Sequence, residues 1–163
     1  MKKLFLALLM LCAILSTTAQ ISGKCIRVVD GDTYIFVTSK NDTLKVRDAY
    51  INTPEPKNSV CSLAQPFSAE SSQAAKDLLL NKEFKIRVFS TDPYNRTLAY
   101  AILPDGSYYH RIMLNKGYAW SYQQSGKNYY RQQWARANKI GLWQNMNAVN
   151  PSDWLRKYST HKK

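Results

Sequence analysis

The fold is decided first by residues 25–37, which read CIRVVDGDTYIFV. Two runs of β-branched and aromatic residues, 25–29 and 33–37, flank the turn signal Asp-Gly-Asp. We therefore expect two strands joined by a tight turn. A second turn at residues 40–42 leads into a third extended segment, which ends at the two prolines of the loop 53–56.

Helical periodicity follows this loop. The segment 67–79 carries one helical face made of Phe67, Ser71, Ala74, Ala75, Leu78 and Leu79. Residues 84–89 alternate as a half-buried strand, and residues 96–103 form a further strand. The turn between these two strands contains Asn95, a residue that tolerates the left-handed conformation.

Two more helices are expected toward the C-terminus, a short one around residues 110–115 and a last one over residues 129–140. The spacing of four residues predicts that they share the inner face of the last helix: Tyr130, Trp134, Ala137 and Gly141, of which Gly141 ends the helix. After it we expect an irregular tail that contains Trp143 and Trp154.

Five short strands, with one helix after the third and two more at the end, make an α+β pattern with about three helices. A small five-stranded barrel, closed or partly open, fits this pattern. A flat open sheet is the weaker alternative, because it would leave edges to protect. No internal repeat or linker divides residues 20–163, so we expect a single domain there.

The composition narrows the class of protein. The chain has 163 residues, of which 45% are hydrophobic, enough for one core of ordinary domain size. Its four Trp, eleven Tyr and five Phe exclude an intrinsically disordered chain. The formal net charge of +12 indicates a polyanionic partner, which could be nucleic acid, acidic lipid or acidic polysaccharide.

The first 19 residues are typical of a secretory signal peptide. Lys2 and Lys3 precede the apolar run 4–15, and small residues up to Ala19 suit cleavage. We expect an exported protein, periplasmic or extracellular, with no stable membrane anchor, because the run is too short to span a bilayer comfortably. An uncleaved N-terminal anchor is the alternative. Cleavage would remove two lysines and lower the net charge from +12 to +10.

Two cysteines, Cys25 and Cys61, remain after this cleavage. An oxidising compartment would allow them to form a disulfide. Two unrelated buried thiols are the other interpretation, and the spacing does not decide between them.

Three polar clusters interrupt the apolar strands: residues 30–33, Arg47 with residues 52–55, and residues 92–96. Each alone is typical of an ordinary turn. Together they supply what phosphodiester hydrolysis needs, which is positive charge on the phosphate and a base for water. Arg47 and Arg96 supply planar forks that bind two phosphate oxygens, and Glu55 supplies the carboxylate.

A hard divalent cation would add further positive charge at such a site. The Asp32 carboxylate, the Asn52 side-chain carbonyl and the Thr53 backbone carbonyl are oxygen ligands that calcium accepts.

Six motifs in register resemble the staphylococcal (thermonuclease-like) nuclease family. They are Val29-Asp30-Gly31-Asp32-Thr33, Arg47 with Thr53-Pro54-Glu55, Gln65-Pro66-Phe67, Asp92-Pro93-Tyr94-Asn95-Arg96, Gly117-Tyr118-Ala119-Trp120 and Lys139-Ile140-Gly141-Leu142-Trp143. The resemblance implies an OB-fold barrel and calcium-dependent cleavage of DNA and RNA. It implies catalytic roles for Arg47, Glu55 and Arg96. It also implies calcium ligands at Asp32, position 52 and the carbonyl of Thr53.

Three positions depart from the family pattern. Asn52 stands where the family has Asp, which removes one negative charge from the metal site and lowers the expected calcium affinity. Asn95 replaces Gly before the second arginine, a change we expect to do little harm. Asp48 stands where the family has an apolar residue, and it could pair with Arg47 or alter the strand.

The basic surplus lies late in the chain. Residues 106–163 hold ten Lys and Arg but one acid, Asp153, and so carry +9. Among the tyrosines, Tyr94 and Tyr122 are the candidates for contact with substrate, because aromatic rings stack on unpaired bases. His110 and His161 are expected to be incidental.

The sequence thus favours an exported, sequence-tolerant nuclease that acts on DNA and RNA as a monomer. A non-catalytic nucleic-acid binder on the same fold is the first alternative, because Asn52 weakens the metal site. A basic exported module for acidic polysaccharide or lipid surfaces is the second, and it rests on charge alone.

Overall fold

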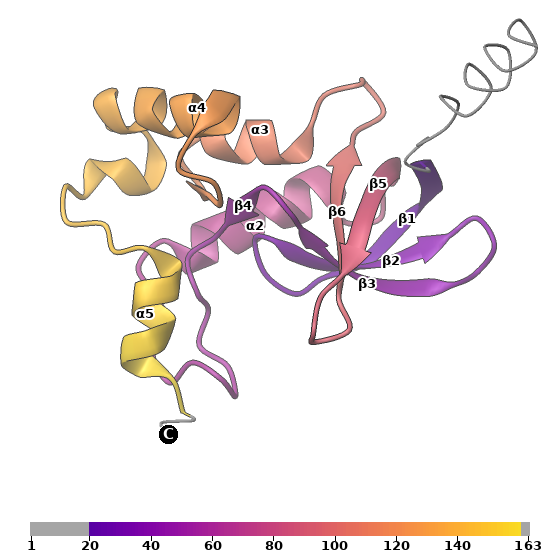
Figure 1. Ribbon diagram of the computed structural model, residues 1–163, viewed down its shortest axis with the longest axis horizontal. Coiled ribbons are helices and arrows are strands. Elements are labelled where there is room, and N and C mark those ends of the chain that lie inside the picture. The colour runs from indigo at the N-terminus through magenta and orange to yellow at the C-terminus, as the bar shows by residue number, and fades with distance from the viewer. Residues whose placement is uncertain (1–19, 161–163) are drawn as a thin grey trace, which may run out of the picture.

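The computed structural model describes residues 20–160, and the expected signal peptide, residues 1–19, lies outside the described residues, as does His161 (Figure 1). Five strands form the barrel: β1 (Gln20–Val28), β2 (Thr33–Thr38), β3 (Thr43–Asp48), β5 (Glu83–Thr91) and β6 (Thr97–Ile102). The barrel is closed in the order β1-β2-β3-β6-β5. The predicted α+β fold with a five-stranded barrel is therefore confirmed, and the flat sheet is excluded.

The pairing of three strands places the polar clusters at one end of the barrel. β2 and β3 are antiparallel, with Thr33 opposite Arg47, so the start of β2 lies beside the end of β3. β3 and β6 are parallel, with Val46 opposite Thr97. The residue before β6, Arg96, therefore lies at the same barrel end as Arg47 and Asp32.

Four α-helices and one short 3-10 helix accompany the barrel. They are α2 (Ser68–Leu79), α3 (Tyr109–Asn115), α4 (Gly126–Ala137), η1 (Gly141–Gln144) and α5 (Pro151–Tyr158). Two short strands, β4 (Ile51–Asn52) and β7 (Trp120–Ser121), pair with each other. In Figure 1 the barrel strands gather on one side and the helices on the other, with α5 beyond the rest.

The core lies between the barrel and α2. Tyr34 and Phe36 on β2 and Ile86 on β5 are fully or almost fully buried, and α2 contributes Ala75 and Leu79. The apolar face of α2 explains why this helix forms after the proline-rich loop, since most helical stability comes from packing of such a face.

The expectation of an irregular tail is wrong. Residues 151–158 form α5, where the Asn150 side chain accepts from the Ser152 N–H and Pro151 occupies the first turn. A capping asparagine followed by proline is a helix start signal, and the sequence pattern contained it.

The expected inner face of α4 is also wrong. Tyr130 and Trp134 are 72% and 55% exposed, and Ala137 is exposed as well. The buried side chains of α4 are Ala135 and the polar Gln132, whose Oε1 accepts the Ser121 N–H at 2.6 Å. A hydrogen bond to β7 therefore fixes the rotation of this helix, which hydrophobic spacing does not reveal.

Asn95 has a φ of 58°, as expected for a left-handed turn residue. Cys25 and Cys61 are buried free thiols, and their S–H groups donate to the carbonyls of Arg27 and Leu63. Of the two interpretations of these cysteines, the structure has the unpaired one. No helix within residues 20–160 is long and apolar enough to cross a membrane.

Candidate active site

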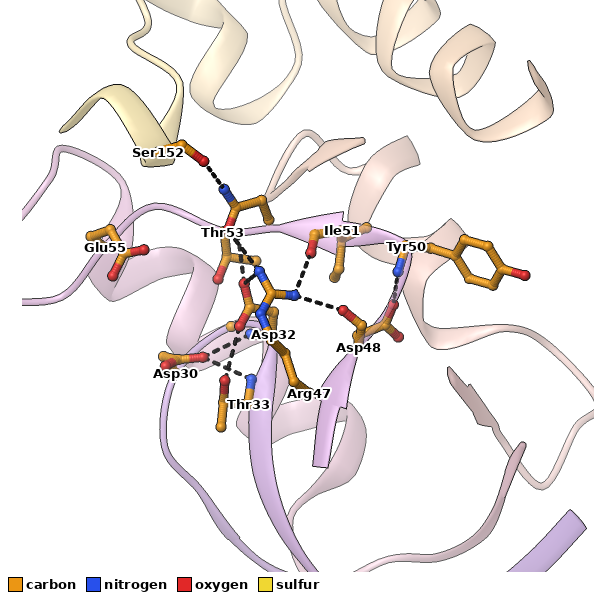
Figure 2. Close-up of polar contacts among 12 residues, drawn as sticks. Asp30, Asp32, Thr33, Arg47, Asp48, Tyr50, Ile51, Thr53, Glu55 and Ser152 are labelled. Atoms are coloured by element: carbon orange, nitrogen blue, oxygen red, sulfur yellow. Dashed lines mark hydrogen bonds and ion pairs between the residues drawn. The ribbon is translucent and has the colours of Figure 1, made fainter. Parts of the chain in front are cut away.

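Asp32 is held in a turn that its neighbour Asp30 orders. One oxygen of Asp30 accepts the N–H groups of Asp32 and Thr33 at 3.0 and 2.7 Å (Figure 2). The Asp32 carboxylate accepts the Thr33 hydroxyl at 2.9 Å and the Thr53 N–H at 3.0 Å. Asp32 is buried. It thus ties the β1–β2 turn to the residue that follows β4.

Arg47 belongs to β3, and its guanidinium is surrounded by the loop that follows this strand. Its NH1 group donates to the carbonyls of Asp48 and Ile51 at 2.8 and 3.1 Å (Figure 2). Its NH2 group donates to Asn52 Oδ1 at 3.0 Å and lies 3.5 Å from Asp32 Oδ2. The loop therefore wraps around the guanidinium and fixes its orientation.

Asn52 is engaged at both ends of its amide. Its Oδ1 accepts from Arg47, and its Nδ2 donates to the Ser152 hydroxyl of α5 at 3.2 Å. A cation bound by this oxygen would have to share it with the guanidinium. The amide donor is one of the contacts that hold α5 against this loop.

Asp48 neither pairs its carboxylate with Arg47 nor disrupts β3, which ends at this residue. The carboxylate is fully buried, and Oδ1 accepts the Tyr50 N–H at 2.9 Å. Within residues 20–160, Oδ2 has no hydrogen-bond partner. Burial raises the pKa of Asp48 to about 7.

Glu55 is positioned through its backbone by Gln65. The Glu55 N–H donates to Gln65 Oε1 at 3.0 Å, and its carbonyl accepts the Gln65 N–H at 2.8 Å. The Gln65 amide in turn donates to the Val149 carbonyl at 2.7 Å. Gln65 therefore joins the loop that carries Glu55 to the segment before α5.

The charge on Glu55 responds to the other three charged residues of the site. Burial raises its pKa to about 7, the charge of Asp32 raises it as well, and Arg47 and Arg96 lower it. Glu55 thus lies within electrostatic reach of Asp32, Arg47 and Arg96. The three clusters that the sequence separates by up to 64 positions meet at one end of the barrel.

Arg96 is held by the turn that precedes it. Its Nε–H donates to Asp92 Oδ2 at 2.7 Å, and Asp92 Oδ1 accepts the N–H groups of Tyr94 and Arg96 at 2.9 Å. This contact uses the Nε–H, so the two terminal amino groups of the guanidinium are the ones that a phosphate could contact.

Each arginine has an exposed tyrosine beside it. Tyr94 is 80% exposed, with its ring centroid 5.6 Å from the Arg96 guanidinium. Tyr122 is 64% exposed, with its ring centroid 5.8 Å from the Arg47 guanidinium. A cleft of about 680 Å³ lies next to Asn52 and is lined by Tyr122, Ser152 and Val149. A larger hollow of about 800 Å³ lies near the other end of β2 and contains none of the sequence-predicted site residues.

The available donors suit a hard cation. The Asp32 carboxylate and the carbonyls of Asn52 and Thr53 are oxygen ligands, which calcium prefers. Within residues 20–160, no three His, Cys, Asp or Glu side chains are grouped so that they could hold a metal ion. A calcium ion here would therefore depend on one aspartate, neutral oxygens and water, which predicts weak binding.

Three residues of the site were missed by sequence reasoning: Asp30, Gln65 and Ser152. Asp30 was treated as turn chemistry, although the same turn orders Asp32. Gln65 appeared only as part of a family motif. Ser152 lies 100 positions from Asn52, and no local pattern signals that contact.

Comparison with known proteins agrees with this geometry. The family described as staphylococcal nuclease homologue matches residues 45–145. An uncharacterized endonuclease of Haemophilus influenzae is 31% identical, over 96% of this chain and 86% of that protein. The micrococcal nuclease of Shigella flexneri is 34% identical, over 85% of this chain and 82% of that protein. An uncharacterized endonuclease of Escherichia coli O157:H7 is 32% identical, over 85% and 88%.

The matched segment includes Arg47, Glu55 and Arg96, and it spans more than half of the chain. A closed barrel of five strands with helices on one side accompanies the match. The chain belongs to the staphylococcal nuclease homologue family.

Proposed function

We propose that this protein is an exported, calcium-dependent nuclease that hydrolyses phosphodiester bonds of DNA and RNA with little sequence specificity. One observation carries the proposal. The carboxylate of Glu55 lies within electrostatic reach of both Arg47 and Arg96, beside the oxygen donor Asp32. Family membership supports a nucleic-acid substrate.

In the proposed reaction, Arg47 and Arg96 bind the non-bridging oxygens of the scissile phosphate. Glu55 accepts a proton from a water molecule as the water oxygen bonds to phosphorus. The bond from phosphorus to the leaving oxygen then breaks, and that oxygen takes a proton from solvent. The two guanidinium groups stabilise the negative charge that builds up on the phosphate in the transition state.

Calcium, when bound, would supply further positive charge to the phosphate oxygens. Asp32, the carbonyl of Thr53 and the side-chain oxygen of Asn52 would hold it. The chain's own part is to orient these oxygens. The Thr53 N–H donates to Asp32 at 3.0 Å and fixes the carboxylate beside the Thr53 backbone.

We expect low sequence specificity because the site can contact a nucleic acid mainly through base stacking and phosphate binding. The exposed rings of Tyr94 and Tyr122 beside the two arginines can stack on any base. Ten basic residues in 106–163 attract the backbone of either nucleic acid. Phosphate contacts and stacking carry little sequence information.

Export is supported by the sequence of residues 1–19. The test is the N-terminus and location of the natural product. A mature chain that begins at Gln20 in the periplasm or the medium would support export, whereas an intact N-terminus in the cytoplasm would refute it.

A nuclease assay tests the activity. The purified mature chain is incubated with single-stranded DNA, duplex DNA and RNA in millimolar calcium, and in parallel with EGTA. Cleavage of DNA and RNA that EGTA stops supports the proposal. Uncut substrates in calcium refute it.

The state of Asn52 favours a second candidate, a nucleic-acid binder without catalysis. Its amide oxygen already accepts from Arg47, so the metal site is weaker than an aspartate would make it. Binding that falls steeply with salt, without cleavage in calcium, would identify this function.

A further inference from the structure

A cavity of about 210 Å³ lies outside the site described above, between the barrel and the start of α4. Four rings, those of Tyr50, Tyr100, Tyr108 and His110, form one side of it. The opposite side comes from the loop and first turn of α4, through Gln123 and residues 125–128.

The rings form one connected aromatic surface. Tyr50 and His110 have ring centroids 4.7 Å apart, and Tyr100 and Tyr108 are 5.5 Å apart. Phe89 extends the surface, 5.7 Å from Tyr50, and is 46% exposed. Tyr100 and His110 are buried, whereas Tyr50 and Tyr108 are partly exposed and offer ring surface on which a planar ligand can stack.

The charge around the cavity is positive. The Arg111 guanidinium lies 4.1 Å from the Tyr108 ring centroid, and Lys127 lines the opposite side. α4 begins at Gly126, and the Ser125 side chain makes no capping hydrogen bond to its first turn. The positive end of the helix dipole therefore faces the cavity. Among the described residues, no Asp or Glu lines it.

His110 supplies a polar group that has no protein partner. Its side chain is 3% exposed, and within residues 20–160 its Nδ1 makes no hydrogen bond. Burial, together with the charges of Arg111 and Arg131, lowers the pKa of His110 to about 3. The ring is therefore neutral near pH 7. His110 thus contributes a neutral ring to the lining of the cavity.

Tyr122 connects the cavity to the candidate active site, because its ring lies beside the Arg47 guanidinium and its backbone contacts Tyr50. The Tyr122 N–H donates to the Tyr50 carbonyl at 2.8 Å. In the loop that follows, Tyr122 and Gln124 line the cleft beside Asn52, and Gln123 and Ser125 line the cavity. A single-stranded nucleic acid that passes over Arg47 and Tyr122 would reach the cavity along this loop.

We infer that this cavity is a nucleotide subsite that takes an unpaired base of a single strand next to the scissile phosphate. The base stacks on the ring surface of Tyr50 and Tyr108, and its phosphate binds Lys127 and the N-terminus of α4. Rings that can stack on a base and cationic groups that can bind a phosphate line the same cavity, and so match the two halves of a nucleotide. The base must be unpaired, because a paired base presents no face to a cavity of this kind. The inference rests on the proposed nucleic-acid substrate, but its test does not require cleavage.

The test measures binding of an eight-nucleotide single-stranded DNA in EGTA, with 2-aminopurine placed at each position in turn. Stacking on an aromatic ring quenches the fluorescence of this base. Tyr108→Leu removes one ring, and Lys127→Gln removes an exposed charge without touching the core. Lys76→Gln on α2 is the matched control, an exposed lysine away from the cavity.

We expect Tyr108→Leu and Lys127→Gln each to raise the Kd of the octanucleotide by at least about fivefold, the lower end for loss of one stacked base. Lys76→Gln should change it by less than about twofold. In the natural protein, at least one 2-aminopurine position should be quenched, and Tyr108→Leu should relieve the quenching at one of these positions.

Unchanged octanucleotide affinity in Lys127→Gln, or no quenched position in the natural protein, would overturn the subsite. If Tyr108→Leu fails to fold by circular dichroism, Lys127→Gln and the quenching of the natural protein still decide. Failure of the proposed function would give a different result. The DNA would then stay uncut in calcium, even if it binds in the cavity.

Discussion

Arg47 donates to the backbone carbonyl of Asp48 at 2.8 Å, while the carboxylate of Asp48 accepts the Tyr50 N–H at 2.9 Å. The two neighbours thus form a hydrogen bond but no ion pair. The acid is left fully buried, and its nearest guanidinium is committed to carbonyl oxygens and to Asn52. Such an acid favours its protonated form, and this makes the stability of the fold depend on pH.

We predict that Asp48→Asn stabilises the protein at alkaline pH. The folded pKa of Asp48 is about 7, raised from 3.8 by burial, so the folded state holds the proton more tightly than the unfolded state. The contribution of the protonated Asp48 carboxyl group to stability is fully present below pH 3.8 and is lost as the pH rises through about 7. Asparagine keeps the Tyr50 contact without a charge. Urea unfolding gives the free energy of unfolding of the variant and of the natural protein. The variant's value minus the natural protein's should be more than about 1 kcal/mol larger at pH 8 than at pH 4.

The exposed Asp77 on α2 provides the control for this prediction, since Asp77→Asn removes an acid from the surface. Its free energy of unfolding should differ from the natural protein's by the same amount at both pH values. A stability difference for Asp48→Asn that does not change with pH would show that folding does not raise the pKa of Asp48.

Glu55→Gln tests the general base. We expect kcat on single-stranded DNA to fall by at least about 100-fold, because glutamine has the shape of glutamate but cannot accept the proton of water. Folding should be preserved, since Gln65 holds residue 55 through backbone groups. Glu70→Gln, an exposed acid on α2, should keep full activity. A kcat near the natural value would remove Glu55 from the mechanism.

Arg96 can be tested with two variants that separate charge from shape. Arg96→Ala should lower kcat by at least about 100-fold, the scale for loss of one charge stabiliser. Arg96→Lys keeps the charge but loses the planar fork and the Nε–H that Asp92 binds. It should recover only part of the activity. Full activity of the lysine variant would show that a point charge suffices and that the turn around Asp92 does not position the group.

The two cysteines give a prediction that is independent of catalysis. The mature chain should expose no reactive thiol when folded and two when unfolded, as counted with a thiol reagent with and without denaturant. The reason is that Cys25 and Cys61 are buried, and burial raises the pKa of Cys25 to about 11, which keeps it a thiol. Adding a reductant should not change the melting temperature. Thiols that react only after both unfolding and reduction would indicate a disulfide instead.

The barrel and its site were predictable where the signal is local. The alternation in β2, the Asp-Gly-Asp turn and Asn95 each determine structure within a few residues, and a family resemblance set their order. The position of α5 was also present in a local pattern, Asn150-Pro151, but Trp154 on its own did not indicate a helix.

What sequence reasoning could not provide are contacts between distant polar groups. Gln132 accepts one hydrogen bond from Ser121, and this contact fixes the rotation of α4 about its own axis. Tyr130 and Trp134 therefore lie at the surface. Ser152 reaches Asn52 from a different element. Hydrophobic spacing measures only the preference of a face for burial, and a single buried amide outweighs it in a helix with few apolar residues.

Asn52→Asp tests the metal site directly. The variant restores one negative charge among the oxygen donors, and calcium affinity rises with ligand charge, so calorimetry should show the Kd for calcium falling by about tenfold. Part of the gain is offset, because an aspartate at position 52 would form an ion pair with Arg47, which a bound calcium ion would have to share. Gln144→Glu, an exposed amide changed to an acid in η1, controls for the added charge alone and should leave the Kd unchanged. Equal calcium affinities in the natural protein and Asn52→Asp would show that position 52 holds no metal. The positive charge that stabilises the phosphate would then have to come from Arg47 and Arg96.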